Sequence, residues 1–472
     1  MGTLTLKYKS VLLADKVRLV LLSAATIILT YFAPSLVTSI WYVLLLVWYF
    51  YSEDEPFWLV FFLITSDGFM GFFGLYEVSI GLLPGLPAIE LVQFYILLSG
   101  IKAFRKNVNP NLFYNKYITV LLIYTIFLIV WGQLLGYSGA LNEYFRILKD
   151  ILPLLLFYSI PRLQRDLFSY QRLFSLIFLV LLLAFFTQIF TLITGIFPLG
   201  TGTLTKVSDQ DTGEFRSFYN TAATLLGIFG ALFFLSSNNK SIFNPNYLYI
   251  IVFSAFGMAF LSATRGWILG FGLIIILSFL FVLRKKTNHV IIFSFISFII
   301  ILMGLSNPRI QEQVNFSLER TLKLEALTEG DLTAEGSLKR LSEKGPKVMK
   351  VWRENPVFGW GYSDVTRANG DGHVGNQNLL MTSGVVGYLL LNSFFVYFMY
   401  KMLTVYLRKR RHPGADTTLL VFVIFLMGWF FIHSSSGQHF SYGGMPIRII
   451  PQAVFFSFGA FIYSQIKKTR YA

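Results

Sequence analysis

The sequence lacks cysteine and has few charged residues, and both shortages restrict the classes of protein that it can encode. Without cysteine the chain forms neither a disulfide nor a thiolate metal site. Only 13% of its residues are charged, about half of what soluble proteins carry, while 55% are apolar and 18% aromatic. Mostly apolar runs of about 17 to 25 residues recur along the chain. This composition predicts an all-α polytopic membrane protein.

Motifs for nucleotide chemistry are also missing. The sequence contains no GxxxxGK[ST] and no GxGxxG motif, and the connections predicted on the cytoplasmic side are too short for a nucleotide-binding domain. We find no convincing internal repeat, which counts against an inverted-repeat transporter. The external carboxylates form no tight pair beside a histidine, so we expect neither a metal nor another cofactor. Any chemistry is therefore expected outside the cell membrane and without nucleotide.

The net charge of +15 would suit a nucleic-acid partner, but the distribution of the basic residues indicates membrane topology instead. Of the 39 Lys and Arg residues, 23 fall in segments that we place in the cytoplasm. Short external segments hold 6, and a long external segment, 306–375, holds 10 together with 10 acidic residues. This bias predicts that both termini are cytoplasmic, and no nucleic-acid partner is expected. The cytoplasmic segments are 1–18, 52–55, 101–116, 161–172, 238–245, 284–289, 401–416 and 466–472.

Hydrophobicity predicts fourteen spans, with twelve as the alternative because the second to fourth are the weakest. The turn Ser52–Glu55 is acidic where a basic one is expected, and Gly81–Pro87 interrupts the fourth span. We divide the chain into transmembrane helices 1–11 (1–305), a large helical periplasmic loop (306–375) and C-terminal transmembrane helices (376–472). The predicted spans are 17–33, 36–51, 56–74, 79–100, 117–137, 148–160, 173–196, 218–236, 246–262, 265–283, 290–305, 376–400, 417–434 and 448–465.

Four basic residues, at the ends of three separate predicted spans, are expected at the external face. Arg265 lies at the junction of two spans, Arg216 precedes the eighth span, and Arg146 and Lys149 open the sixth. As the alternative, each side chain could snorkel, so that its charged end reaches the interface between membrane and water. Convergence on one face favours binding instead, because the planar guanidinium group suits phosphate oxygens. A lipid diphosphate is the ligand that we expect.

A polar run with one histidine leads directly into a long apolar span. It reads Asp371–Gly–His–Val–Gly–Asn–Gln–Asn378. Histidine titrates near neutral pH, so His373 is our candidate general base, with a surface-loop histidine as the alternative. Asn376 and Asn378 could orient the imidazole or a sugar.

Four further residues near this face are secondary candidates. Trp360 and Tyr362 could stack on a sugar ring or belong to the aromatic belt at the membrane interface. His433 and His439 are expected to have structural roles.

These residues carry a resemblance over about residues 115–465. The sequence resembles the O-antigen ligase and O-antigen polymerase superfamily, bacterial membrane glycosyltransferases of the GT-C type. Three motifs carry the resemblance: Arg216–Ser–Phe–Tyr–Asn220, Ser262–Ala–Thr–Arg–Gly266, and Glu354–Asn–Pro–Val–Phe–Gly–Trp–Gly361 leading to His373. In that family the loop more often reads His-Asn directly. Here Val374 and Gly375 intervene, which leaves both Asn376 and Asn378 open as the matching position.

The resemblance implies a donor, an active-site face and a set of roles. The donor is an undecaprenyl-diphosphate-linked glycan at the periplasmic face of the inner membrane. Arginines hold the diphosphate, with Asn220 counted among the substrate-binding residues, and His373 activates the acceptor hydroxyl for an inverting, metal-independent transfer. Membrane lipids, a polysaccharide chain-length regulator and a flippase are the expected further partners.

Two questions stay open from the sequence. The acceptor is a growing glycan (polymerase), a lipid A core sugar (ligase) or, as the last choice, a protein serine (O-oligosaccharyltransferase). The competing class is a transporter or flippase, which moves the lipid-linked glycan without chemistry and has no need of His373.

Overall fold

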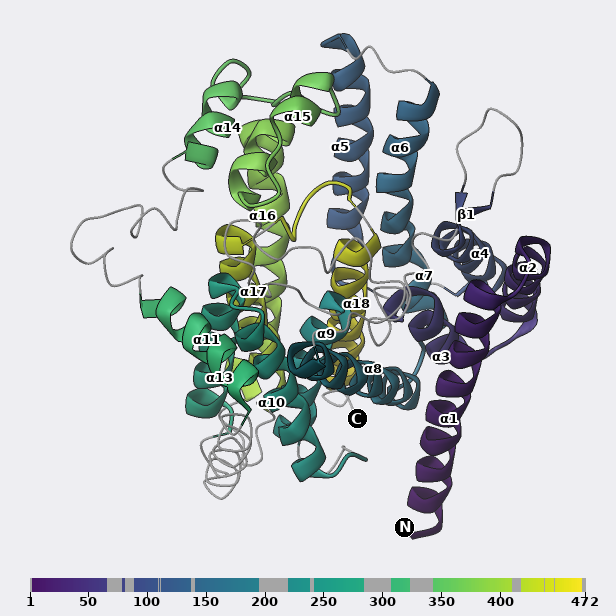
Figure 1. The fold of residues 1–472 in the computed structure, drawn as a ribbon. Helices are drawn as coiled ribbons and strands as arrows, with labels where there is room; N and C mark the ends of the chain where they lie inside the picture. Colours follow the sequence, from purple (N-terminus) through teal and green to yellow (C-terminus); the bar gives the residue numbers. More distant parts are fainter. Residues whose placement is uncertain are drawn as a thin grey trace.

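The structure is a computed structural model, and most of the residues that it describes are helical (Figure 1). A short antiparallel pair, β1 (Ser79–Ile80) and β2 (Ile89–Glu90), is the one sheet in the described part. The described residues are 2–65, 79–80, 89–108, 110, 112–136, 141–194, 220–237, 242–283, 307–322, 343–409, 417–436, 438–444 and 446–468.

The helices follow one another through most of the chain. Along the sequence they are α1 (Gly2–Phe32), α2 (Ser35–Tyr51), α3 (Glu55–Leu59), the π-helix η1 (Val60–Ile64), α4 (Leu91–Arg105), α5 (Asn115–Leu134), α6 (Leu141–Ile151), the 3-10 helix η2 (Leu152–Leu155), α7 (Leu156–Leu163), α8 (Leu167–Thr194), α9 (Thr221–Ser236), α10 (Pro245–Leu261), α11 (Arg265–Phe281), α13 (Pro308–Leu322), α14 (Gly345–Trp352), α15 (Asp364–Asn369), α16 (Gly375–Lys409), α17 (Thr418–Ser436) and α18 (Pro446–Lys468).

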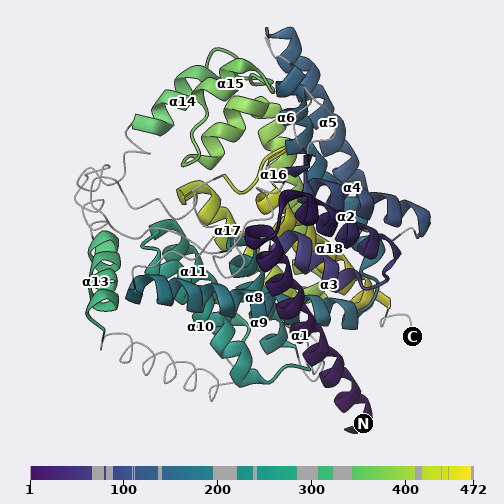
Figure 2. The same ribbon diagram turned by 45° about the vertical axis from the view of Figure 1, so that its right-hand side comes forward.

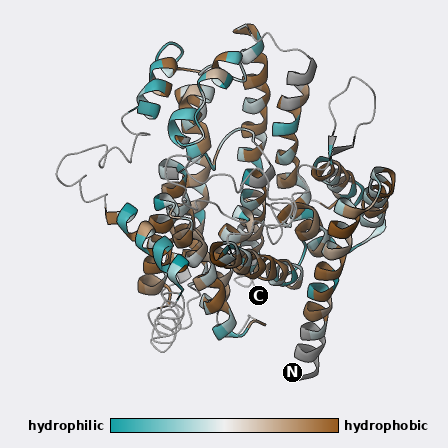
Figure 3. Ribbon diagram, viewed as in Figure 1, coloured by the Kyte–Doolittle hydropathy of each residue, from teal (hydrophilic) through white to brown (hydrophobic). Residues whose placement is uncertain are grey.

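Five helices of the described part, within α5, α8, α16, α17 and α18, are long and apolar enough to cross a membrane. Their outward side chains fit this role, because large apolar groups such as Phe186 (60% exposed) and Leu389 (61%) face away from the protein. Hydrophilic residues concentrate on α13 and α14, which Figure 3 shows outside the apolar bundle. The prediction of a helical fold is confirmed, and the five candidate spans agree with the prediction of a multi-pass membrane protein.

Two predicted spans have a different form in the structure. The fourth, 79–100, is wrong in its first half, because α4 begins at Leu91 after the β1–β2 pair. The side chains of Glu90 and Gln93 cap its first turn. The sixth, 148–160, consists of α6, η2 and α7, with Pro153 in the 3-10 turn where an α-helical N–H would be lost. The predicted eleventh span, 290–305, lies outside the described residues.

The acidic turn at 52–55 is neutralised by basic residues from other helices. Asp54 pairs with Arg18 and with Arg172, each at 2.7 Å. Arg172 also makes two bonds to Asp15, at 2.7 and 2.9 Å. The network ties α1 and α8 to the turn. It explains why a turn with acidic residues occurs where the positive-inside bias predicts basic ones.

The close packing of α11 against α17 shows which ends of these two helices lie side by side. A Cβ at Gly270 would collide with Ile432, and a Cβ at Gly428 would collide with Ile274. Residue numbers therefore rise along one helix while they fall along the other, so the two helices are antiparallel. The start of α11 consequently lies beside the end of α17, where the candidate site is found.

Candidate functional site

The helix that follows His373 is broken at Gly384. This residue has φ 63° and ψ −175°, so α16 consists of a half-helix, 375–383, and a long helix, 385–409. At the break, backbone N–H and C=O groups of α16 lose their partners within the helix, and the loop 356–361 forms hydrogen bonds with them. The N–H groups of Trp360 and Gly361 donate to Met381 and Thr382, both at 2.8 Å. On the other side of the break, Val385 and Val386 donate to the carbonyls of 356 and 357, at 2.9 and 3.1 Å.

Glycines in the loop allow this close backbone approach. Gly359 and Gly361 have φ values of 68° and 57°, a region that favours glycine. A Cβ at Gly359 would lie 2.5 Å from the N of Gly384, and one at Gly361 would lie 2.8 Å from the N of Gly132 in α5. The Gly-Trp-Gly sequence thus locks the loop between α5 and the half-helix. This backbone frame holds the end of the half-helix in place.

His373 lies just before the first turn of the half-helix and is exposed. Its backbone N–H donates to Asp371 Oδ1 at 2.8 Å, and Lys344 Nζ lies 3.4 Å from Asp371 Oδ2. Burial raises the pKa of Asp371, but the His373 N–H and Lys344 lower it by more, so the net pKa lies below its usual value. Asp371 is therefore ionised and anchors the histidine loop at neutral pH.

The two asparagines after His373 have different environments. Asn378 is 4% exposed, accepts from the N–H of Asp371 at 3.1 Å and donates its amide to the Asp371 carbonyl. It therefore positions the loop that carries His373. Asn376 donates to Ser434 Oγ at 2.7 Å, and its Oδ1 is buried without a hydrogen-bond partner in the described part of the chain. Asn376 is the better placed of the two to contact a substrate.

Arg265 begins α11 and is only 5% exposed. Extension of the side chain to the aqueous interface would expose the guanidinium group, so this burial counts against that alternative. The turn before Arg265 is rigid: Ala263 has φ 50°, and Gln313 and Ser317 of α13 donate to the carbonyls of Leu261 and Phe260, both at 2.8 Å. A cation at a helix N-terminus faces the positive end of the helix dipole, where an anion is favoured.

Histidines at the end of α17 complete the same region. His433 is fully buried, and its Nδ1 accepts from the N–H groups of His439 and Phe440 at 3.0 and 3.2 Å. The ring of His439 packs against Trp267 of α11, 5.3 Å between centroids. Burial lowers the pKa of His439 to about 3, and His433 and Arg448 add to this effect. His439 is thus neutral, which fits the structural role expected from the sequence.

Arg448, in the first turn of α18, is a cation at this end that sequence reasoning missed. Its backbone carbonyl accepts from Gln452 at 3.0 Å, and Gln452 also donates to the carbonyl of His439 at 2.6 Å. The signal in the sequence was a lone arginine at the external end of the last predicted span.

Other predicted residues are engaged elsewhere or lie outside the described part. Lys149 pairs with Glu90 at 3.2 Å. Asn220 is 1% exposed and caps α9, accepting from Ala223 at 2.8 Å and donating to the Ile64 carbonyl at 2.5 Å. These contacts give both residues a structural role. Arg216 and the side chain of Arg146 lie outside the described residues.

The two aromatic candidates pack into the protein. Trp360 donates to the Val351 carbonyl at 2.9 Å and packs against the small cluster of Val348, Val374 and Met381. Burial raises the pKa of Tyr362, with Asp150 adding to the rise, so its phenol stays protonated. The Tyr362 hydroxyl lies against Gly443. In these positions both rings support the loop 356–361, and Trp360 is only partly buried.

The start of α9 lies beside the end of α10, where Thr224 contacts Met258 at 3.6 Å. Asn376, at the start of α16, contacts Ser434 of α17, and Trp267 of α11 and Gln452 of α18 contact His439, just after α17. Figure 2 shows α14 and α15 beside the upper part of α16, while α13 lies with α10 and α11. The starts of α11 and α16 thus lie at the same end of the bundle, and helix N-termini favour anions.

No family model and no curated protein matches this sequence. The functional interpretation therefore depends on the residues and their geometry. Together at one end of the bundle lie His373, Asn376, Arg265 and Arg448, with His433 and His439 between them.

Proposed function

We propose that the protein is an inverting, metal-independent glycosyltransferase. It would move a glycan from an undecaprenyl-diphosphate carrier to a sugar acceptor at the periplasmic face of the bacterial inner membrane. The acceptor would be a growing polysaccharide or a lipid A core sugar. In this proposal the chain has a GT-C-like arrangement of 12–14 spans, with both termini in the cytoplasm.

One observation supports this proposal most strongly. A buried arginine, Arg265, begins α11 at the end of the bundle where the half-helix that follows His373 also begins. Helix N-termini and guanidinium groups are the two protein features best suited to phosphate oxygens. A general base beside a diphosphate site is what transfer requires and what transport does not.

The proposed roles follow from the chemistry of the transfer. The acceptor hydroxyl attacks the anomeric carbon while the bond from that carbon to the diphosphate oxygen breaks, and the diphosphate leaves with the electron pair. His373 takes the hydroxyl proton as the new bond forms. Arg265 and Arg448 stabilise the negative charge that grows on the leaving diphosphate. Asn376 binds the sugar or the imidazole.

Replacement of His373 with Ala tests the proposal. Positioned proton transfer contributes about 10²- to 10⁴-fold, so the variant should lose activity by that order and still bind the lipid-linked donor. Gln377→Ala, a polar change in the same helical turn, should stay near wild type. The assay is transfer of a labelled glycan from undecaprenyl diphosphate in reconstituted membranes. Wild-type turnover by His373→Ala would exclude this residue as the base.

The same assay separates transfer from transport. A flippase would carry the labelled donor across the membrane and never pass the glycan to an acceptor. Translocation by the wild-type protein without any transfer product would favour the transporter.

A further inference from the structure

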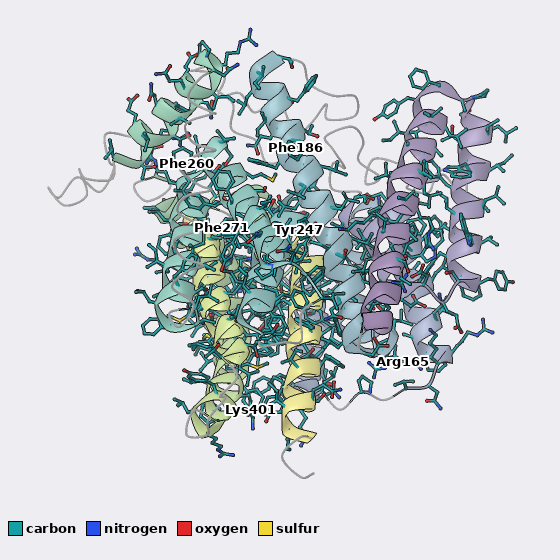
Figure 4. The ribbon with its side chains drawn as sticks, turned by 90° about the horizontal axis from the view of Figure 1, so that it is seen from below. Arg165, Phe186, Tyr247, Phe260, Phe271 and Lys401 are labelled. Carbon is teal, nitrogen blue, oxygen red and sulfur yellow. The ribbon has the colours of Figure 1, made fainter. Side chains whose placement is uncertain are left out.

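A cavity of about 680 Å³ opens at the end of the bundle opposite to the candidate site. Its wall is formed by the late parts of α16 and α18, the junction of α7 with α8, and the segment before α5. Figure 4, which views the molecule from below, shows Arg165 and Lys401 on either side of α18. The lining residues are Val108, Pro110, Leu112, Phe113, Pro161, Gln164, Arg165, Tyr170, Lys401, Ser457, Ala460, Phe461, Tyr463, Ser464, Gln465 and Lys467.

Positive charge is unbalanced among these lining residues. Arg165, Lys401 and Lys467 contribute three cations, and the lining includes neither Asp nor Glu. Arg165 and Lys467 are exposed, and Lys401 lies 5.2 Å from the ring of Tyr397. A basic pocket between membrane helices is a typical site for an anionic lipid headgroup.

Buried polar groups in the wall indicate that something more than hydrocarbon enters the cavity. Gln164 is 2% exposed, and neither its side-chain nitrogen nor its oxygen has a hydrogen-bond partner within the described residues. Tyr170 is fully buried, and its hydroxyl has no partner there either. Buried polar groups are costly unless they are paired. A ligand with hydroxyl groups would satisfy both.

Apolar residues complete the lining and make the cavity suited to an amphiphile. Phe113, Phe461 and Tyr463 contribute aromatic surface beside the cations. Acyl chains can lie along such surface while the headgroup contacts the charged and polar residues. A fully soluble anion would use the three cations and leave the apolar surface uncovered.

We propose that this cavity binds an anionic glycerophospholipid with a hydroxyl-bearing headgroup. The phosphate lies among Arg165, Lys401 and Lys467, and the headgroup hydroxyls bond to Gln164 and Tyr170. The site is independent of the proposed glycosyl transfer, because it lies at the other end of the bundle. The bound lipid would stabilise the junction between α7, α16 and α18.

Thermal unfolding of the purified full chain in neutral detergent tests this site. Phosphatidylglycerol should raise the melting temperature, whereas phosphatidylcholine with the same acyl chains should not. The triple variant Arg165→Gln, Lys401→Gln, Lys467→Gln should weaken the apparent affinity for phosphatidylglycerol on the order of 100-fold. Arg408→Gln, which removes an exposed charge from the same end of α16 but not from the cavity, should bind as the wild type does.

A second variant and a soluble probe keep the test decisive. Ser464→Phe fills the cavity without changing the charge, so it should also abolish the effect of phosphatidylglycerol. Equal stabilisation by the two lipids would show that the anionic headgroup is not recognised, and wild-type binding by both cavity variants would place the lipid elsewhere. Either result would overturn the proposal. If sn-glycerol 3-phosphate stabilises the protein as well as the lipid does, the ligand is a soluble phosphate and the lipid assignment is wrong.

Discussion

Substitution of Gly384 by alanine is the most direct test of how the candidate site is held. The added Cβ would collide with the carbonyl of Val357 and lie 2.5 Å from the N of Gly359. Both neighbours are backbone atoms, so no flexible side chain can move aside. The φ of 63° with ψ of −175° also belongs to a region that is almost exclusive to glycine. The loop 356–361 must therefore move away from the break in α16.

The magnitude follows from the interactions at the break. A backbone held in a sparsely populated region costs about 1–3 kcal/mol. If two of the four hydrogen bonds across the break open, their loss adds about 0.5–1.5 kcal/mol each. The total destabilisation is then about 2–6 kcal/mol. Displacement of the loop also moves the half-helix that follows His373, so activity should fall together with stability.

Two glycines provide matched controls for this measurement. Gly136 has φ 91° but no atom within 4 Å of an added Cβ, so Gly136→Ala reports backbone strain alone. Gly372 precedes His373 and has neither a positive φ nor a close neighbour, so Gly372→Ala should be neutral. The assay is the melting temperature of each purified variant in one detergent. Equal melting temperatures for Gly384→Ala and Gly372→Ala would refute the described packing of loop against helix.

Three further variants test individual residues. Arg265→Ala should lose a charge-assisted contact worth about 1.5–3 kcal/mol and raise the apparent Kd for the lipid diphosphate donor; Arg265→Lys should recover little, and unchanged donor binding would exclude this role. His433→Ala should lower the melting temperature, because two backbone N–H groups lose their acceptor; His433→Asn, whose Oδ1 can replace Nδ1, should recover part of the loss, and equal melting of the two would contradict this reasoning. For Asp371 the folded pKa is lowered, so its stabilisation is full above the unfolded pKa of about 3.9 and is lost as pH falls through the folded value. Asp371→Asn should flatten the fall in melting temperature below about pH 4, and an unchanged profile would show that this carboxylate carries no such effect.

Much of the helical layout could be predicted from the sequence. The spans predicted at 218–236, 246–262 and 265–283 correspond closely to α9, α10 and α11. Long apolar runs decide the positions of such helices locally, because every backbone group must be paired within the helix when no water is available. The sequence also located the histidine loop and the arginine at the start of α11, since both stand at boundaries between polar and apolar segments.

Only the tertiary structure decided how these parts meet. Gly384 follows Thr382 and Ser383 inside a predicted span, but these residues alone do not specify the break, which the distant loop 356–361 stabilises. The roles of Asn376 and Asn378, which the sequence left open, differ because one contacts α17 and the other holds Asp371. The unpaired amide of Gln164 likewise has meaning only beside the cavity that surrounds it. Hydrophobic periodicity is a local signal, because it depends only on residues that are close together in the sequence. These features instead arise from backbone and polar contacts between segments that are far apart in the sequence.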